Sequence, residues 1–192
     1  MLESSLSNVA TERFTPWFVR DQQWARVGLP LAIVLGLLGP LLRPAFGQSR
    51  FLIFLQLPVY MLHQFEEHGH GRFKAYVARL FPRARGVSDE NICIVNVGVW
   101  VINLAALYLA RFDRLALSLI APYLAVVNGI LHLVTGVRAR RYNPGLATAT
   151  VLLVPVGGVS LVRVARASHA TRGDHMRGLG GAILVHLLTI IL

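Results

Sequence analysis

Composition places this chain among membrane proteins. It has 192 residues, of which 55% are hydrophobic and 15% are charged, a balance that excludes disorder and is unusual for a water-soluble domain. The net charge of +10 suggests nucleic acid, but Lys and Arg stand singly between apolar runs and gather on no polar face, so we expect no nucleic-acid partner. The one cysteine, Cys93, allows neither an internal disulfide nor a cysteine-based zinc site.

The chain starts with a polar segment. Residues 1–26 carry acidic and basic side chains ahead of any apolar run, which does not fit a cleaved signal peptide. We expect an interfacial segment there, with Trp17, Phe18 and Trp24 at the level of the lipid headgroups.

Six apolar runs follow and predict an all-α, polytopic transmembrane helix bundle, one domain over residues 27–192. A helix needs about 20 residues to cross the hydrocarbon core. The third, fourth and fifth runs meet this length, whereas the first contains Pro30 and Pro40 and the last is short. The sequence therefore predicts five or six spans. The runs cover residues 27–42, 51–65, 91–110, 115–137, 146–164 and 179–192.

The basic residues give a weak orientation. With six spans, the side that holds Arg72 and Arg138 receives eleven of the 19 Lys and Arg residues. The positive-inside rule then places that side in the cytoplasm. We expect a multi-pass protein of the inner (cytoplasmic) membrane, in contact with membrane lipids.

Two adjacent acids extend the second apolar run. At about 1.5 Å per residue, Glu66 lies about 22 Å beyond Phe51, inside a hydrocarbon core about 30 Å thick. Glu67 follows it directly. Neighbouring carboxylates at that depth are costly unless a cation, a proton or a polar cavity compensates them.

Histidines accompany these acids. On a helical wheel His63, His70 and the two glutamates fall within a sector roughly 100° wide. Two imidazoles and two carboxylates should therefore face one surface. His68 points elsewhere, and we interpret it as a solvated residue at the helix end.

A second polar pair lies in the fourth run. Asn128 and His132 stand one turn apart on one face. His132 lies about 9 Å inside Arg138, and Glu66 lies about 9 Å inside Arg72. The two groups therefore match in depth, and Asn96 of the third run lies at a similar level.

Three motifs in this order carry a resemblance. They are His63-Gln-Phe-Glu66-Glu67, Asn128-Gly-Ile-Leu-His132 and Tyr142-Asn-Pro-Gly145-Leu-Ala-Thr148. Together they resemble the signatures of a bacterial integral-membrane family named for its His-x-x-Glu-Glu (HXXEE) motif, which has no assigned reaction. The resemblance implies that the motif residues form one site, which comprises His63, Glu66, Glu67, Asn128, His132, Tyr142, Pro144, Gly145 and Thr148.

A divalent transition metal, zinc or iron, suits such a set. His63 and Glu67, at i and i+4, can hold one ion from one helix, and His132 can close the site from another. Open coordination positions would remain for an activated water. Glu66 and Tyr142 are then the candidate catalytic groups. The groups expected to orient ligands or bind substrate are Asn128, Thr148, Asn96 and His70.

Other interpretations of the same residues stay open. A glutamate pair that shares a proton can isomerise or cyclise a substrate without metal. The acids can also serve ion or lipid binding or transport, although no internal repeat favours a transporter, or make only polar contacts between helices. We expect a metal-dependent membrane enzyme, a hydrolase or an oxygenase, with a lipidic or isoprenoid-like substrate. Its pocket should lie among the second to fifth runs and open between Arg72 and Arg138.

Overall fold

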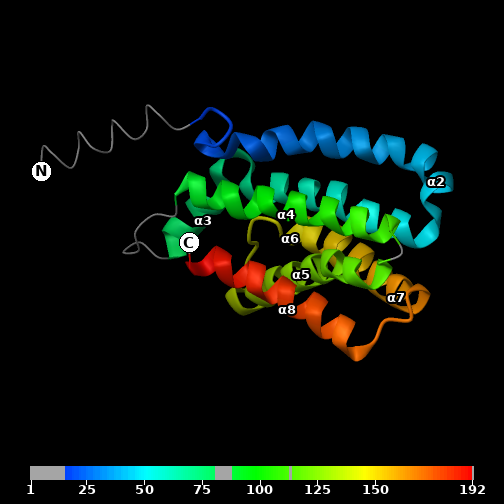
Figure 1. Cartoon of the computed structure of the whole chain (residues 1–192). Helices are drawn as coiled ribbons and strands as arrows, with labels where there is room; N and C mark the ends of the chain where they lie inside the picture. Colours follow the sequence, from blue (N-terminus) through cyan, green and yellow to red (C-terminus); the bar gives the residue numbers. More distant parts are fainter. Residues whose placement is uncertain (1–15, 81–87, 113, 192) are drawn as a thin grey trace, which may run out of the picture.

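The regular elements of the structure are all helices, as the sequence predicts. The structure, a computed structural model, describes residues 16–80, 88–112 and 114–191 (Figure 1). Residues 1–15 of the expected interfacial segment lie outside the described residues. The described part of that segment holds a short 3-10 turn, η1 (Arg20–Gln22), directly before the first long helix.

Among the residues that the structure describes, four helical stretches are long and apolar enough to cross a membrane: Arg20–Leu80, Asp89–Arg111, Leu115–Ala139 and Leu146–Ala167. Large apolar side chains cover the outside of these stretches. Leu37 and Leu41 in the first, and Val137 in the third, are each at least 74% exposed. Such exposure is favourable in lipid and costly in water, so the arrangement indicates a membrane protein.

The longest element, α2 (Gln23–His68), is two helices joined by a reversal. A straight helix of its 46 residues would be about 69 Å long, more than twice the thickness of the hydrocarbon core. Gly47 breaks it with φ 67° and ψ 172°, a conformation that glycine adopts without steric cost. The chain therefore folds back, and residues 23–46 and 48–68 form two arms (Figure 1).

The remaining long helices pack against α2 and against one another. Helix α2 contacts α4 and α7, and α5 contacts α7 and α8. In Figure 1 the start of α2 and the end of α8 lie at the same end of the bundle, and α3 lies there too. The elements are η2 (Gly69–Gly71), α3 (Arg72–Leu80), α4 (Asp89–Arg111), η3 (Leu115–Leu119), α5 (Ile120–Ala139), α6 (Leu146–Thr148), the π-helical turn η4 (Ala149–Leu153), α7 (Val154–Ala167) and α8 (Arg172–Ile191).

One aromatic residue of the expected interfacial segment lies inside the bundle. Trp24 is fully buried, with its ring centroid 5.0 Å from that of His68 and 6.2 Å from that of Trp100. Trp24 therefore packs against protein side chains, and its depth at headgroup level stays a prediction. The start of α2 places this side chain between the second arm and α4, where its large apolar area is covered. Trp17, by contrast, is 62% exposed.

Candidate metal centre

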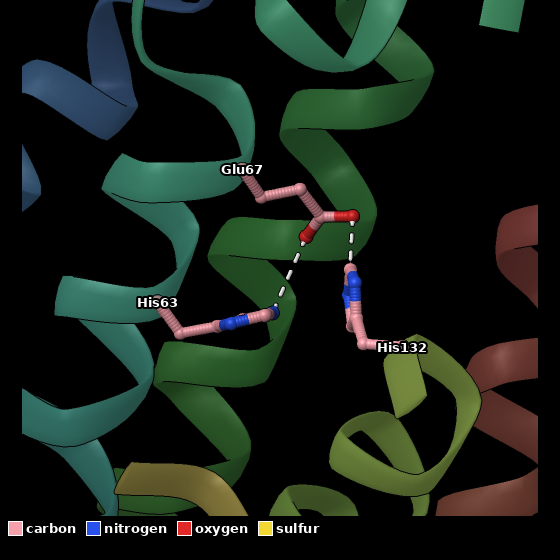
Figure 2. Close-up of side chains that lie close together, drawn as sticks. All are labelled: His63, Glu67 and His132. Carbon is pink, nitrogen blue, oxygen red and sulfur yellow. Dashed lines mark ion pairs between the residues drawn. The ribbon is translucent and has the colours of Figure 1, made fainter. Parts of the chain in front are cut away.

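Two helices bring the predicted ligands together (Figure 2). His63 and Glu67 come from the second arm of α2, and His132 comes from α5. His63 Nε2 lies 3.5 Å from Glu67 Oε2, and His132 Nε2 lies 3.6 Å from Glu67 Oε1. The two imidazole centroids are 4.8 Å apart, well within the 10 Å or so that a shared site allows. The matching depths in the sequence therefore correspond to a real contact.

The other nitrogen of each imidazole has an oxygen partner. His132 Nδ1 lies 2.7 Å from Asn143 Oδ1, and His63 Nδ1 lies 2.9 Å from Thr148 Oγ1. The Thr148 hydroxyl donates to Glu66, so it accepts from the His63 ring. In a neutral ring the proton then sits on Nδ1 and the lone pair is on Nε2, facing Glu67. This is how metal-binding histidines are usually held.

Asn128 supports the same orientation of His63. Its amide nitrogen lies 3.2 Å from His63 Nε2 and donates to the Tyr60 hydroxyl at 2.9 Å. An imidazole nitrogen that accepts from an amide cannot also donate to the Glu67 carboxylate. A neutral imidazole nitrogen has one lone pair, so a cation or a proton that binds His63 Nε2 and balances the charge of Glu67 would replace the hydrogen bond from Asn128.

Glu66 has different partners from those of Glu67. Its carboxylate accepts hydrogen bonds from the Ala147 amide at 3.1 Å, the Thr148 amide at 2.7 Å, and the hydroxyls of Tyr142 and Thr148. These four donors all belong to the segment that connects α5 to α7. The contacts indicate that Glu66 anchors this segment to α2.

Tyr142 belongs to this anchor. It lies in the loop between α5 and α6 and is 56% exposed. Partial burial of its hydroxyl and the hydrogen bond to Glu66 raise the pKa of Tyr142 to about 12. The phenol therefore stays protonated at neutral pH and donates to Glu66.

Gly145 lies against both imidazoles. It has φ 94°, and a Cβ atom there would lie 2.7 Å from His63 Cε1 and 2.8 Å from His132 Cε1. Both the backbone conformation and the space thus require glycine. The connecting segment therefore sets how closely the two rings approach each other.

His68 and His70 exchange the positions that the sequence predicts. His68 is 2% exposed; its Nδ1 lies 2.9 Å from Gln22 Oε1 and its Nε2 3.2 Å from Glu67 Oε2. The interpretation of His68 as a solvated helix-end residue is therefore wrong. Helix α2 ends at His68, and the turn at Gly69–Gly71, with φ 64° at His70, carries His70 to Arg26, 2.7 Å away.

Asn96 lies in a neighbouring polar group. Its side-chain oxygen accepts from Gln64 Nε2 at 3.0 Å, and Gln64 Oε1 accepts from the Trp100 indole. Asn96 also lines the cavity described next. Sequence reasoning missed Gln64 and Asn143, although their positions inside the motifs that begin at His63 and Tyr142 were an available signal.

A cavity of about 680 Å³ opens beside the ligands. Glu67, His68 and His132 contribute to its polar part, and Arg138 lines it as expected. The side chains around them come from the second arm of α2, α3, α4, α5 and α8, so α8 takes the place predicted for the fifth run. Arg72 does not reach the cavity, because its guanidinium donates to the Phe65 carbonyl at 2.7 Å.

The chain matches the family model described as a protein of unknown function with HXXEE motif, over residues 54–160. It belongs to this HXXEE family. The matched region is more than half of the chain and contains each of the three motifs that meet at the cluster. No curated protein and no solved structure gives a significant match.

Proposed function

We propose that this HXXEE protein is a metal-dependent membrane enzyme that acts on a lipidic substrate. The observation that carries the proposal is that His63, Glu67 and His132 each offer one ligand atom, all within 4.8 Å of one another. In a tetrahedral site with bonds near 2.0–2.1 Å, ligand atoms stand about 3.4 Å apart. The separations of 3.5 and 3.6 Å end on different oxygens of Glu67, so the carboxylate lies between the two imidazoles, and a single oxygen ligand would need a small adjustment of the side chains.

The chain's own residues would hold and orient such an ion. His63 and His132 would bind it through Nε2, and Glu67 would supply negative charge. Zinc or non-haem iron fits a set of two imidazoles and one carboxylate with open positions. The ion would polarise a substrate group or a water molecule that enters from the cavity.

The bundle would cross the bacterial inner membrane six times in this proposal. The two arms of α2, then α4, α5, α7 and α8, would each span it. The end that carries the cluster would face the cytoplasm, in line with the excess of Lys and Arg on that side.

Metal analysis tests the proposal. Full-length protein purified in mild detergent without chelator should contain about one zinc or iron per chain. His132→Ala should remove this metal, whereas His169→Ala, an exposed histidine in the turn before α8, should retain it. A wild-type protein that contains no metal and takes up none from added zinc would overturn the proposal.

A metal-free function is the second candidate, and the position of His68 favours it. Three imidazoles surround Glu67, at 3.2, 3.5 and 3.6 Å, and a single imidazolium among them would neutralise the carboxylate. Such a pair can move protons in an isomerase or cyclase, or hold a cation or proton without chemistry. Titration of the histidines by NMR, with and without zinc, separates the candidates, since metal would hold His63 and His132 neutral.

Two carboxylate variants divide the roles of the acids. Glu67→Gln should weaken metal binding because a neutral amide is a poor ligand. We infer that Glu66 is a positioning residue, so Glu66→Gln should lower the melting temperature and weaken zinc binding, because an amide NH2 would face N–H and O–H donors. If Glu66→Gln instead keeps both properties and loses only turnover, Glu66 is the general base that the sequence predicts.

A further inference from the structure

The apolar face of α3 forms one wall of the cavity. Phe73, Tyr76, Val77 and Leu80 stand at i, i+3, i+4 and i+7, which is the spacing of one helical face, and all four line the cavity. None of the residues of α3 is buried. An amphipathic helix gains stability when its apolar face is covered. The residues that the structure describes cover this face only in part, so an apolar ligand would complete it.

The opposite wall carries a polar strip. His132, Thr135 and Arg138 of α5 all line the cavity, and the six residues from His132 to Arg138 correspond to about 9 Å along the helix. Arg138 is exposed and has no ion-pair partner among the residues that the structure describes. A permanently charged guanidinium thus lies at one end of the strip, and the ligand cluster lies at the other.

We propose that the cavity binds an anionic amphiphile with a single hydrocarbon chain. Its acidic group pairs with Arg138, because a guanidinium suits carboxylate and phosphate oxygens, and its chain lies against the apolar face of α3. The volume of about 680 Å³ lies within the range of roughly 300–1,000 Å³ that small-molecule sites occupy. This assignment of the substrate class rests on the proposed function of the same site.

The geometry has a consequence for the reaction. The acidic group at Arg138 would be about 9 Å, measured along α5, from His132. The cluster would therefore act on a carbon along the chain of the amphiphile. Binding of the acidic group by Arg138 would decide which carbon lies at the cluster. Positioning of this kind supplies orientation without a conformational change in the cluster.

Binding of two matched ligands tests the proposal. The full chain is placed in nanodiscs of uncharged phosphatidylcholine, and the affinities of palmitate and hexadecanol are compared by competition with a fluorescent fatty acid. Palmitate should bind the wild type about tenfold or more tightly than hexadecanol. Arg138→Gln should remove this preference, whereas Arg141→Gln, an exposed neighbour outside the cavity, should keep it.

A second variant tests the place of the hydrocarbon chain. Val77→Trp on α3 should weaken both ligands by filling the cavity, while Ala78→Trp, on an exposed position of the same helix outside the cavity lining, should not. Equal affinity of the wild type for both ligands, equal effects of the two arginine variants, or no effect of Val77→Trp would each overturn the proposal.

Metal content keeps this test separate from the previous one. Arg138→Gln and Val77→Trp should leave the zinc content unchanged, because neither residue contacts the ligand cluster. A protein that prefers palmitate and holds no metal would retain this inference and refute the metal-dependent function. A protein that holds metal and shows no preference would do the reverse.

Discussion

Replacement of Gly145 by alanine should open the ligand cluster. The added Cβ atom would lie 2.7 Å from His63 Cε1 and 2.8 Å from His132 Cε1, against ordinary carbon contacts of about 3.5–4.0 Å. Each ring would have to withdraw by about 1 Å, whereas metal sites tolerate about 0.2 Å in a ligand distance. The φ of 94° adds about 1–3 kcal/mol of backbone strain.

We expect Gly145→Ala to weaken zinc binding at least 10- to 100-fold, the range seen when groups that orient metal ligands are lost. The assay is titration of the purified chain with Zn²⁺ or Co²⁺, the latter followed by its visible absorption. Gly158→Ala is the matched control, because its Cβ would meet nothing within 4 Å. If Gly145→Ala binds zinc as tightly as the wild type, the close approach of the His63 and His132 rings at Gly145 is not needed for zinc binding.

Three further substitutions test separate parts of the structure. Thr148→Val removes the acceptor for His63 Nδ1 and one donor to Glu66, so zinc affinity by calorimetry should fall about 10- to 100-fold; an unchanged affinity would show that the ring needs no partner. Gly47→Ala should cost about 1–3 kcal/mol from strain at φ 67°, seen as a lower melting temperature, whereas Gly36→Ala in the first arm should not destabilise. Gln64→Leu leaves the buried Trp100 indole and Asn96 without their partner, and should lower the unfolding free energy by about 1–3 kcal/mol in denaturant titrations; equal stability would mean that the polar group is dispensable.

The close approach of His63, Glu67 and His132 could be predicted from the sequence because it depends on regular helix geometry. His63 and Glu67 are four residues apart, and a helix places such residues on one face wherever it packs. The depths of His132 and Glu66 follow from a constant rise per residue, measured from Arg138 and Arg72. Both inferences need only the helices and the membrane normal, and the contact between His63 and His132 confirms them.

The end of helix α2 was not predicted in this way. The helical wheel carried His70 onto the face of His63, but α2 ends at His68 and the turn at Gly69–Gly71 moves His70 to Arg26. The same ending brings His68 to Glu67. A wheel assumes that the helix continues, whereas α2 ends against Gly69, and Gly71 has a positive φ of 69°.

The amino-acid sequence by itself determined a helical membrane protein of the HXXEE family, with His63, Glu67 and His132 at one level. The three motifs indicate the family, and composition and periodicity suffice for the rest, because apolar runs and residue spacing act locally. Only the tertiary structure decided that Glu66 anchors the segment from Tyr142 to Thr148, that each imidazole presents Nε2 to Glu67, and that α3 and α8 complete the cavity. These features depend on which side chains meet across helices, and helix packing sets this at distances that no local pattern encodes.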